Sequence, residues 1–120
     1  MKKVLIVDDH PDIRQLIRIT LGSVCEVLEA ADGMAALQIA RQQQPRVVVL
    51  DIMMPGEMDG LQVLDAIRAD PTLDDTQVIM VTARGQAKDH QTGMDRGACA
   101  YFIKPFSPIE LVNRIKELLK

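Results

Sequence analysis

Short runs of consecutive apolar residues recur along the chain and are separated by longer segments with a helical pattern. Such runs are typical of strands that are covered on both faces of a sheet. The intervening segments place apolar residues at i, i+3, i+4 and i+7, which is typical of amphipathic helices. Five strands alternating with five helices predict the α/β class with a parallel sheet. The predicted strands are Val4–Val7, Cys25–Ala30, Arg46–Asp51, Gln77–Thr82 and Ala100–Ile103.

The predicted helices are bounded by residues that favour helix ends. Proline is tolerated in a first turn, aspartate and serine are good N-caps, and glycine or proline ends a helix. The fourth helix, Gln86–Arg96, has few apolar positions and a glycine, so low local stability is expected there. The boundaries are Pro11 and Gly22 for the first helix, Asp32 and Pro45 for the second, Asp59-Gly60 and Asp70-Pro71 for the third, and Ser107 with Glu110 as a capping box for the fifth.

Composition limits the possible functions. The 120 residues suffice for one domain, and nearly half are apolar with only three aromatic residues, so the core must be aliphatic. The net charge of −3 argues against direct nucleic-acid binding by this domain. No apolar run approaches the ~20 residues of a membrane span, and the N-terminus lacks a signal-peptide pattern, so we expect a cytoplasmic protein without membrane contact. Cys25 and Cys99 have no metal-binding spacing and are expected to be buried thiols.

Four of the five predicted strands end in a polar residue or are directly followed by one. In a parallel sheet the carboxyl ends of all strands lie at the same edge, which is where open α/β sheets bind ligands. The second strand ends in Ala30-Ala31 instead, which an edge position in the sheet would explain. The polar residues that should converge are Asp8, Asp9, Asp51, Thr82 and Lys104.

This convergence predicts phosphoryl chemistry. Two carboxylates ~4 Å apart repel each other by ~4 kcal/mol at an effective dielectric constant near 20, so three of them need more compensation than one lysine provides. A Mg²⁺ ion is a suitable complement. A carboxylate beside Mg²⁺ can attack a phosphoryl group, whose oxygens the Lys104 ammonium and Thr82 hydroxyl can bind. Taken singly, each aspartate could instead be a helix cap and Thr82 a turn residue.

With these residues assembled, the whole chain resembles the receiver domain of bacterial two-component response regulators. The resemblance implies a flavodoxin-like (βα)5 fold, a three-layer sandwich with a parallel sheet of order 2-1-3-4-5. It also implies a signalling switch rather than an enzyme that turns over a substrate. The motifs that carry it are Val7-Asp8-Asp9, Leu50-Asp51, Met54-Pro55-Gly56, Asp59-Gly60, Val81-Thr82-Ala83 and Lys104-Pro105-Phe106.

The resemblance assigns roles to the acidic residues. It implies that Asp51 is the phospho-acceptor, which receives a phosphoryl group from a sensor histidine kinase or a phosphotransfer protein. It implies that Asp9 and Asp51 are direct ligands of Mg²⁺ (or Mn²⁺), helped by the backbone carbonyl of Met53. Asp8 would act mainly through water.

The resemblance also implies a conformational switch. Lys104 would contact the phosphoryl group, and its bond to Pro105 is a candidate cis peptide. Thr82 would move toward the phosphoryl oxygens, and Tyr101 would move inward with it. The expected switch surface comprises the fourth helix, fifth strand and fifth helix. This surface would control a downstream protein or output domain, and it could also form a homodimer.

Two departures from the family pattern concern the rim of the pocket. The loop Met54–Gly60 is one residue longer than the usual spacing, which should alter the rim more than the chemistry. Met53, two residues after the acceptor, stands where many members carry a polar residue near the attacking water, so we expect a long-lived phospho-Asp51. His10 and Arg84 are further residues of the pocket rim, and His10 is expected to be a loop residue rather than a metal ligand.

The implied sheet order excludes a disulfide, because the second and fifth strands would be opposite edges, roughly 19 Å apart. Two other functional classes stay open. The chain could be a degenerate receiver that serves as a constitutive interaction scaffold, although its intact acidic residues argue against this. It could also be a small Mg²⁺-dependent phosphohydrolase, although Met53 stands where that enzyme would want a general acid. Residues 1–120 form one expected receiver domain, either free-standing or part of a longer regulator.

Overall fold

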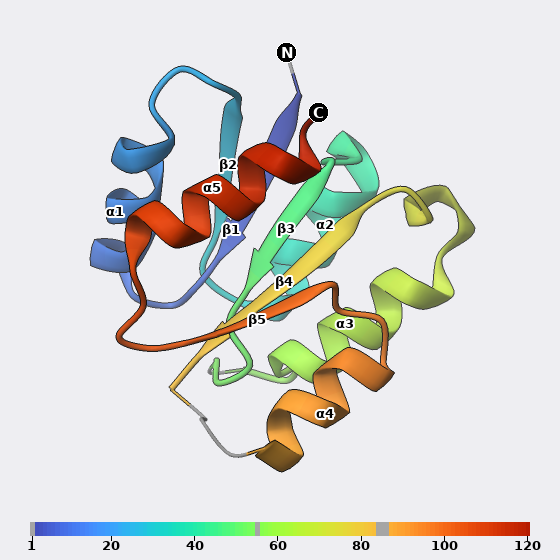
Figure 1. Cartoon of the computed structure of the whole chain (residues 1–120). Coiled ribbons are helices and arrows are strands. Elements are labelled where there is room, and N and C mark those ends of the chain that lie inside the picture. Colours follow the sequence, from blue (N-terminus) through green and yellow to red (C-terminus); the bar gives the residue numbers. More distant parts are fainter. Residues whose placement is uncertain (1, 55, 84–86) are drawn as a thin grey trace.

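The computed structural model describes residues 2–54, 56–83 and 87–120, except for the side chains of residues 87–90. The helices and strands follow one another in the predicted order (Figure 1). They form one parallel sheet of order β2-β1-β3-β4-β5, which confirms the predicted class and strand order. The elements are β1 (Lys3–Val7), α1 (Pro11–Leu21), β2 (Glu26–Ala30), α2 (Gly33–Gln43), β3 (Val47–Leu50), α3 (Gly60–Ala69), the short 3₁₀ helix η1 (Pro71–Leu73), β4 (Gln77–Thr82), α4 (Ala87–Asp95), β5 (Ala100–Ile103) and α5 (Pro108–Leu118).

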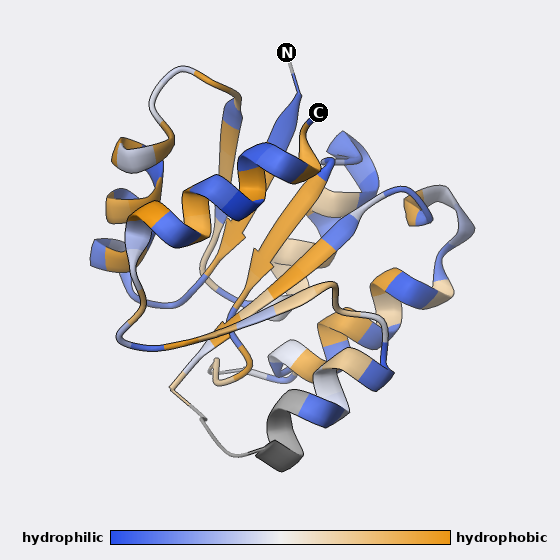
Figure 2. Ribbon diagram, in the orientation of Figure 1, coloured by the Kyte–Doolittle hydropathy of each residue, from blue (hydrophilic) through white to orange (hydrophobic). Residues whose placement is uncertain are grey.

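Helices cover both faces of the sheet, as expected for a three-layer sandwich. Successive strand residues point to opposite faces. In β1, Leu5 and Val7 pack into the cluster beneath α2 and α3, whereas Val4 and Ile6 pack into the cluster beneath α1 and α5. Figure 2 shows the central strands as almost continuously apolar, between helices that alternate in polarity. Within the described ranges, no helix combines the length and apolar character that a membrane crossing requires.

The two edge strands are less buried than the central ones. All four residues of β3 are buried, whereas β2 begins with the exposed Glu26 and continues with half-buried residues. Cys25 directly precedes β2, and Cys99 directly precedes β5, at opposite edges of the sheet. Both are free thiols, which confirms that no disulfide joins them. Cys25 is buried as predicted, but Cys99 is only partly buried.

Several boundaries and burial assignments differ from the sequence expectation. β3 ends at Leu50, so Asp51 is the first residue after the strand rather than its last. The apolar positions Ile13, Leu16, Ile17 and Leu21 of α1 are spaced as one helical stripe, which predicts burial, but Leu16 is 40% exposed. Ser107 accepts a hydrogen bond from the Glu110 backbone N–H at 3.3 Å, which is one half of the predicted capping box. Asp59 and Gln62 instead form a complete box at the start of α3.

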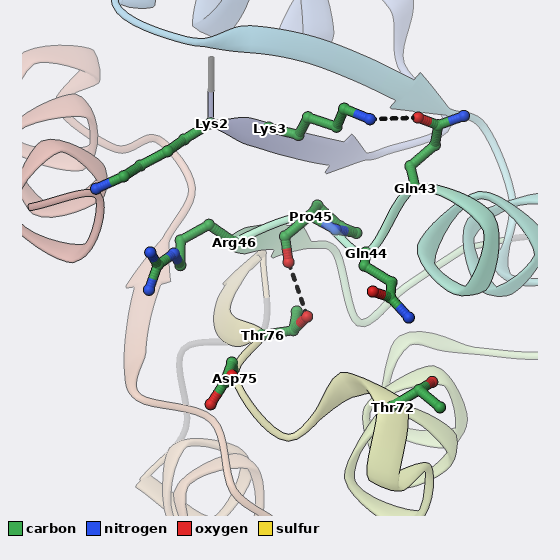
Figure 3. A pocket seen from close by; sticks show the side chains of 9 residues that line it. All are labelled: Lys2, Lys3, Gln43, Gln44, Pro45, Arg46, Thr72, Asp75 and Thr76. Carbon is green, nitrogen blue, oxygen red and sulfur yellow. Dashed lines mark hydrogen bonds between the residues drawn. The ribbon is translucent and has the colours of Figure 1, made fainter.

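At the amino edge of the sheet, where the parallel strands begin, side chains donate hydrogen bonds to neutral acceptors (Figure 3). The Thr76 hydroxyl donates to the Pro45 carbonyl at 2.7 Å, and the Lys3 ammonium donates to the Gln43 side chain at 2.7 Å. Three basic residues, one acidic residue and several neutral ones surround a cavity of about 400 Å³ at this edge. The lining residues are Lys2, Lys3, Gln43, Gln44, Pro45, Arg46, Thr72, Asp75 and Thr76.

Candidate phosphoryl-transfer site

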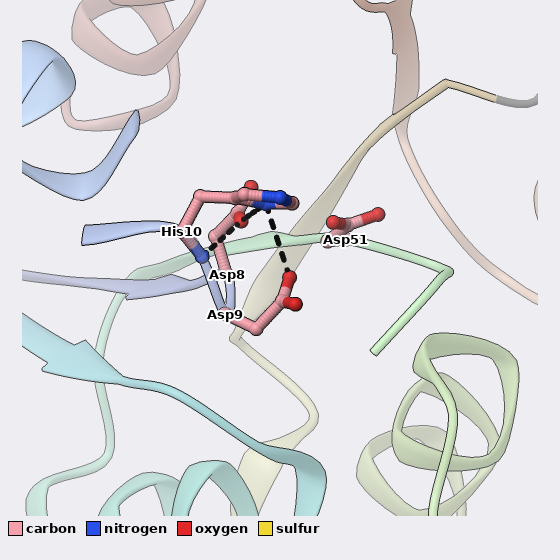
Figure 4. Close-up of side chains that lie close together, drawn as sticks. All are labelled: Asp8, Asp9, His10 and Asp51. Carbon is pink, nitrogen blue, oxygen red and sulfur yellow. Dashed lines mark hydrogen bonds and ion pairs between the residues drawn. The ribbon is translucent and has the colours of Figure 1, made fainter. Parts of the chain in front are cut away.

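The carboxyl edge of the sheet gathers the polar residues that the sequence predicts to converge. β1 and β3 run side by side in register, so the residues that follow them, Asp8 and Asp51, are neighbours. Thr82 is the last residue of β4, and Lys104 directly follows β5. Four neighbouring side chains form an acidic cluster, in which one possible ligand atom from each lies within 4.8 Å of the others (Figure 4). This acidic cluster comprises Asp8, Asp9, His10 and Asp51.

Lys104 joins the two buried carboxylates of the cluster. Its Nζ donates to Asp8 Oδ2 at 2.7 Å and to Asp51 Oδ2 at 3.1 Å. Asp8 and Asp51 are each only 3% exposed, so these are charge-assisted bonds in a largely desolvated setting. The Lys104-Pro105 peptide bond is cis, as predicted. One lysine therefore serves two carboxylates, and a third carboxylate, Asp9, stands beside them.

Burial and charge oppose each other at this site. Burial raises the pKa of the Asp51 carboxyl above its ordinary value, and it outweighs the hydrogen bonds from Lys104 and from the Met53 backbone N–H, which lower that pKa. Burial alone would lower the pKa of Lys104, but the hydrogen bonds and charges of Asp8 and Asp51 raise it overall. Lys104 thus stays a cation, while the charged form of Asp51 is incompletely stabilised by protein groups.

Asp9 carries an oxygen that the protein leaves unsatisfied. Its Oδ1 is shielded from solvent and accepts no hydrogen bond, although His10 Nδ1 lies 3.2 Å away. A buried polar atom that accepts no hydrogen bond costs about 1–3 kcal/mol, which a bound cation would offset. Carboxylate oxygens are the ligands that Mg²⁺ and Mn²⁺ prefer. The residues of the acidic cluster therefore fit a divalent metal ion.

The loop after β3 holds Asp51 by close backbone packing. The Gly60 N–H donates to the Ile52 carbonyl at 2.8 Å. A Cβ at Gly60 would lie 2.1 Å from the Asp51 carbonyl oxygen, so only glycine allows α3 to start this close to the acceptor. The Met53 N–H donates to Asp51 Oδ1 at 3.0 Å, which orients the carboxylate. Met53 itself is 52% exposed.

The longer loop borders a groove beside the acidic cluster. Pro55, within this loop, lies outside the described residues, but the loop from Gly56 to Met58 is described. It faces the segment Ala31–Met34 and Asp9 across a groove of about 640 Å³. Gly56, Glu57 and Met58 of the longer loop therefore line this groove.

Thr82 and Tyr101 lie in the two neighbouring strands β4 and β5. Thr82 is fully buried at the end of β4, and Tyr101 is partly buried in β5, beside Met80 of β4. A Cβ at Gly93 of α4 would lie 3.7 Å from the Tyr101 ring, so the ring packs close to that helix. Arg84, expected at the pocket rim, lies outside the described residues.

A supporting network at the site was missed by the sequence reasoning. Arg14 of α1 donates to the Asp8 carbonyl at 2.5 Å and to Glu29 of β2 at 3.0 Å. The other Glu29 oxygen lies 2.7 Å from Arg18. Burial raises the pKa of Glu29, but the two arginines outweigh it and lower that pKa overall. The available signal was the pair of arginines four residues apart on one face of α1, opposite an acidic residue in the edge strand.

Comparisons with known proteins agree with this geometry. A family model described as the response regulator receiver domain matches residues 4–116. A probable transcriptional regulator, ycf27, from Cyanophora paradoxa is 44% identical over 120 residues, which cover 99% of this chain and 48% of that protein. The chain thus spans about half the length of the curated relatives it matches.

Solved structures show the same fold along their whole length. The chemotaxis protein CheY4 of Vibrio cholerae is 34% identical, with a TM-score of 0.88 over 98% of both chains. The BeF3-activated receiver domain of DrrB, a Thermotoga maritima protein, is 29% identical, with a TM-score of 0.89 over 99% of this chain and 97% of that one.

Proposed function

The chain belongs to the response regulator receiver domain family, and on this premise we propose that it is a phospho-acceptor switch whose acceptor is Asp51. The observation that carries the proposal is the setting of Asp51. Its carboxylate is buried at the carboxyl edge of the sheet, within reach of the Lys104 ammonium and beside the unsatisfied oxygen of Asp9. A carboxylate in this setting is a nucleophile with a cation already placed to receive the transferred oxygens.

The proposed reaction is a phosphoryl transfer from a phosphohistidine of a sensor histidine kinase or phosphotransfer protein. An Asp51 oxygen attacks phosphorus, so that an O–P bond forms while the N–P bond to the imidazole breaks. The leaving imidazole nitrogen takes up a proton. Lys104, already 3.1 Å from Asp51, stabilises the negative charge on the transferred oxygens. The chemistry takes place on the chain itself, so the protein is not an enzyme in the ordinary sense.

Asp9 and Asp51, with the Met53 backbone carbonyl, are the groups that would hold Mg²⁺ or Mn²⁺, and Asp8 would act through water. The bound ion supplies positive charge for the carboxylates and for the phosphoryl oxygens. The hydrogen bonds of Asp8 to Lys104 and to the His10 backbone N–H support its less direct role, because both its oxygens already have partners.

The proposed output is a shift of the α4-β5-α5 face. A phosphoryl group on Asp51 adds charge that the Thr82 hydroxyl can bind by moving toward it. Tyr101 then follows inward, and its packing near Gly93 passes the change to α4. Because curated relatives are described as transcriptional regulators, the target of this face is a downstream protein or an output domain, and a homodimer through the same face is an alternative arrangement.

A phosphodonor experiment tests the proposal. The protein is incubated with Mg²⁺ and acetyl phosphate, and its mass is compared with those of Asp51→Asn and Asp59→Asn. Asp59→Asn is the matched control, because Asn can also cap α3 and Asp59 belongs to no metal cluster of the described residues. One phosphoryl group should appear on the protein and on the control, but not on Asp51→Asn. No adduct at all would indicate a scaffold, and sustained phosphate release would indicate a phosphohydrolase.

The exposed thioether of Met53 gives a second test of the site. A thioether accepts hydrogen bonds only weakly and cannot position an attacking water well. We therefore expect phospho-Asp51 to be long-lived, and Met53→Asn to shorten its lifetime. Met34→Asn is a control, because Met34 is similarly exposed, at 57%, but belongs to the groove rather than to the acceptor loop. An unchanged or longer lifetime in Met53→Asn would contradict this role of Met53.

A further inference from the structure

His10 stands where a capping residue is expected but does not cap its helix. It occupies the N-cap position of α1, and its side chain makes no hydrogen bond to the first turn. Histidine is not among the residues favoured at this position. A residue that departs from a local preference, such as the preference for a capping side chain, without stabilising the helix is expected at functional positions. The other N-cap residues that are described all accept a hydrogen bond from their first turn: Asp32, Asp59, Asp70 and Ser107.

The His10 imidazole lies against the acidic cluster instead (Figure 4). Its Nδ1 is 3.0 Å from Asp8 Oδ1 and 3.2 Å from Asp9 Oδ1. In a six-coordinate ion with bonds of ~2.1 Å, neighbouring ligand atoms lie about 3 Å apart. The ring nitrogen is therefore placed, relative to the unsatisfied Asp9 oxygen, as an adjacent ligand of one ion would be. The ring is 64% exposed, so it can adjust without opening the core.

We infer that His10 is a nitrogen ligand of the metal site and that the site therefore favours ions that bind imidazole, such as Zn²⁺, more strongly than its carboxylates alone would. This inference rests on the proposed function only in using the same metal site. Mg²⁺ is a hard ion that prefers oxygen, whereas imidazole suits Zn²⁺ and neighbouring transition metals. Phosphorylation of Asp51 would then depend on which divalent ion is available.

A simpler role for His10 predicts a different result. As a hydrogen-bond or ion-pair partner of Asp8 and Asp9, His10 would change the charge of the site for every cation alike. Its removal would then shift the affinities for Mg²⁺ and Zn²⁺ by the same factor. A true ligand contributes bond energy that differs between the two ions. The ratio of the two affinities, rather than either affinity alone, therefore separates the two roles.

Calorimetric titration of the protein with Zn²⁺ and with Mg²⁺ tests the inference. The variants are His10→Gln and His10→Asn, and Asn also restores a favoured N-cap, so a loss of binding cannot be ascribed to unfolding of α1. His90→Gln removes the other histidine of the chain and serves as the control. We expect both His10 variants to bind Zn²⁺ at least about 10-fold more weakly, with Mg²⁺ affinity within about 2-fold of the wild type.

A spectroscopic measurement provides an independent readout. In ¹⁵N NMR spectra, one equivalent of Zn²⁺ should shift the His10 Nδ1 resonance in wild-type protein, and Mg²⁺ should not. Equal losses for both ions in the His10 variants, or an unshifted resonance, would overturn the inference. Acetyl phosphate with Mg²⁺ should still phosphorylate His10→Gln, so failure of this inference would leave the assignment of Asp51 intact.

Discussion

The two edges of the sheet are both polar, but they differ in whether their charged groups are buried. At the carboxyl edge, Asp8 and Asp51 are almost fully buried and share one cation, Lys104. At the amino edge, the buried polar group is the neutral Thr76, whose hydroxyl donates to the Pro45 carbonyl. The charged residues around the amino-edge cavity are exposed or partly exposed.

This difference separates a reactive edge from a structural one. Exposed ion pairs contribute about 0–1 kcal/mol, because water screens them and the side chains lose entropy. A buried carboxylate without full compensation is much more costly, and it retains the capacity to bind a cation or to attack an electrophile. Polarity at a sheet edge is therefore not the signal of a site. The signal is ionisable groups that are buried together with too little opposite charge.

The largest expected effect comes from removing the cation that the buried carboxylates share. Lys104→Met keeps much of the side-chain volume but leaves the carboxylates of Asp8 and Asp51 without the cation that they share. We expect the free energy of unfolding in metal-free buffer at neutral pH to fall by about 3 kcal/mol. Urea denaturation measures this change. Lys3→Met is the matched control at the amino edge, where the ammonium has, among the described residues, only an exposed hydrogen bond to Gln43. This substitution should cost less than about 1 kcal/mol. Equal losses of unfolding free energy in the two variants would contradict the view that only the carboxyl edge contains a charge that the buried groups require.

Most of the fold and the acidic residues could be predicted because they depend on short-range pattern and topology. The apolar runs that end at Val7 and Leu50 predict parallel central strands, and parallel strands bring Asp8 and Asp51 together without detailed geometry. The bonds of Arg14 and the orientation of His10 could not be predicted, because they depend on how α1 packs against the edge strand. Whether a single residue such as Leu16 is buried depends on the face of the neighbouring helix. The spacing of apolar residues along the sequence does not predict it either.

Removing one of the crowded carboxylates should raise the free energy of unfolding rather than lower it. Asp9→Ala eliminates the unsatisfied Oδ1 and its repulsion with Asp8 and Asp51. The partly exposed position of Asp9 reduces the gain, so we expect about 1 kcal/mol more stability in metal-free buffer at neutral pH. Mg²⁺ binding should be lost in the same variant. Thermal melting with and without Mg²⁺ measures both, and a lower melting temperature in metal-free buffer would contradict this account of the cluster.

A smaller effect is expected in the pKa values of two carboxyls, Asp51 at the carboxyl edge and Asp70 near the amino edge, which should shift in opposite directions. Burial raises the pKa of Asp51, whereas hydrogen bonds from Thr72, followed by Arg41, lower the pKa of Asp70 near the amino edge. The Asp51 contribution to stability is therefore present below the ordinary Asp range and is lost as pH rises through its raised pKa. The Asp70 contribution is present above that range and is lost as pH falls through its lowered pKa. Carbon-13 NMR titration of metal-free protein should show these opposite displacements, and displacements of the same sign would refute the contrast.

The smallest effect is expected at Arg46, the exposed cation that directly precedes β3. Its backbone holds the sheet together, because its N–H donates to the Lys3 carbonyl and its carbonyl accepts from Gln77, each at 2.9 Å. Its guanidinium group, in contrast, makes no hydrogen bond or ion pair with other described residues. Arg46→Gln should therefore change the free energy of unfolding by no more than about 0.5 kcal/mol and leave Mg²⁺ affinity unchanged. A loss above about 1 kcal/mol in urea denaturation would mean that the amino edge also depends on charge, and the distinction between the two edges would have to rest on burial alone.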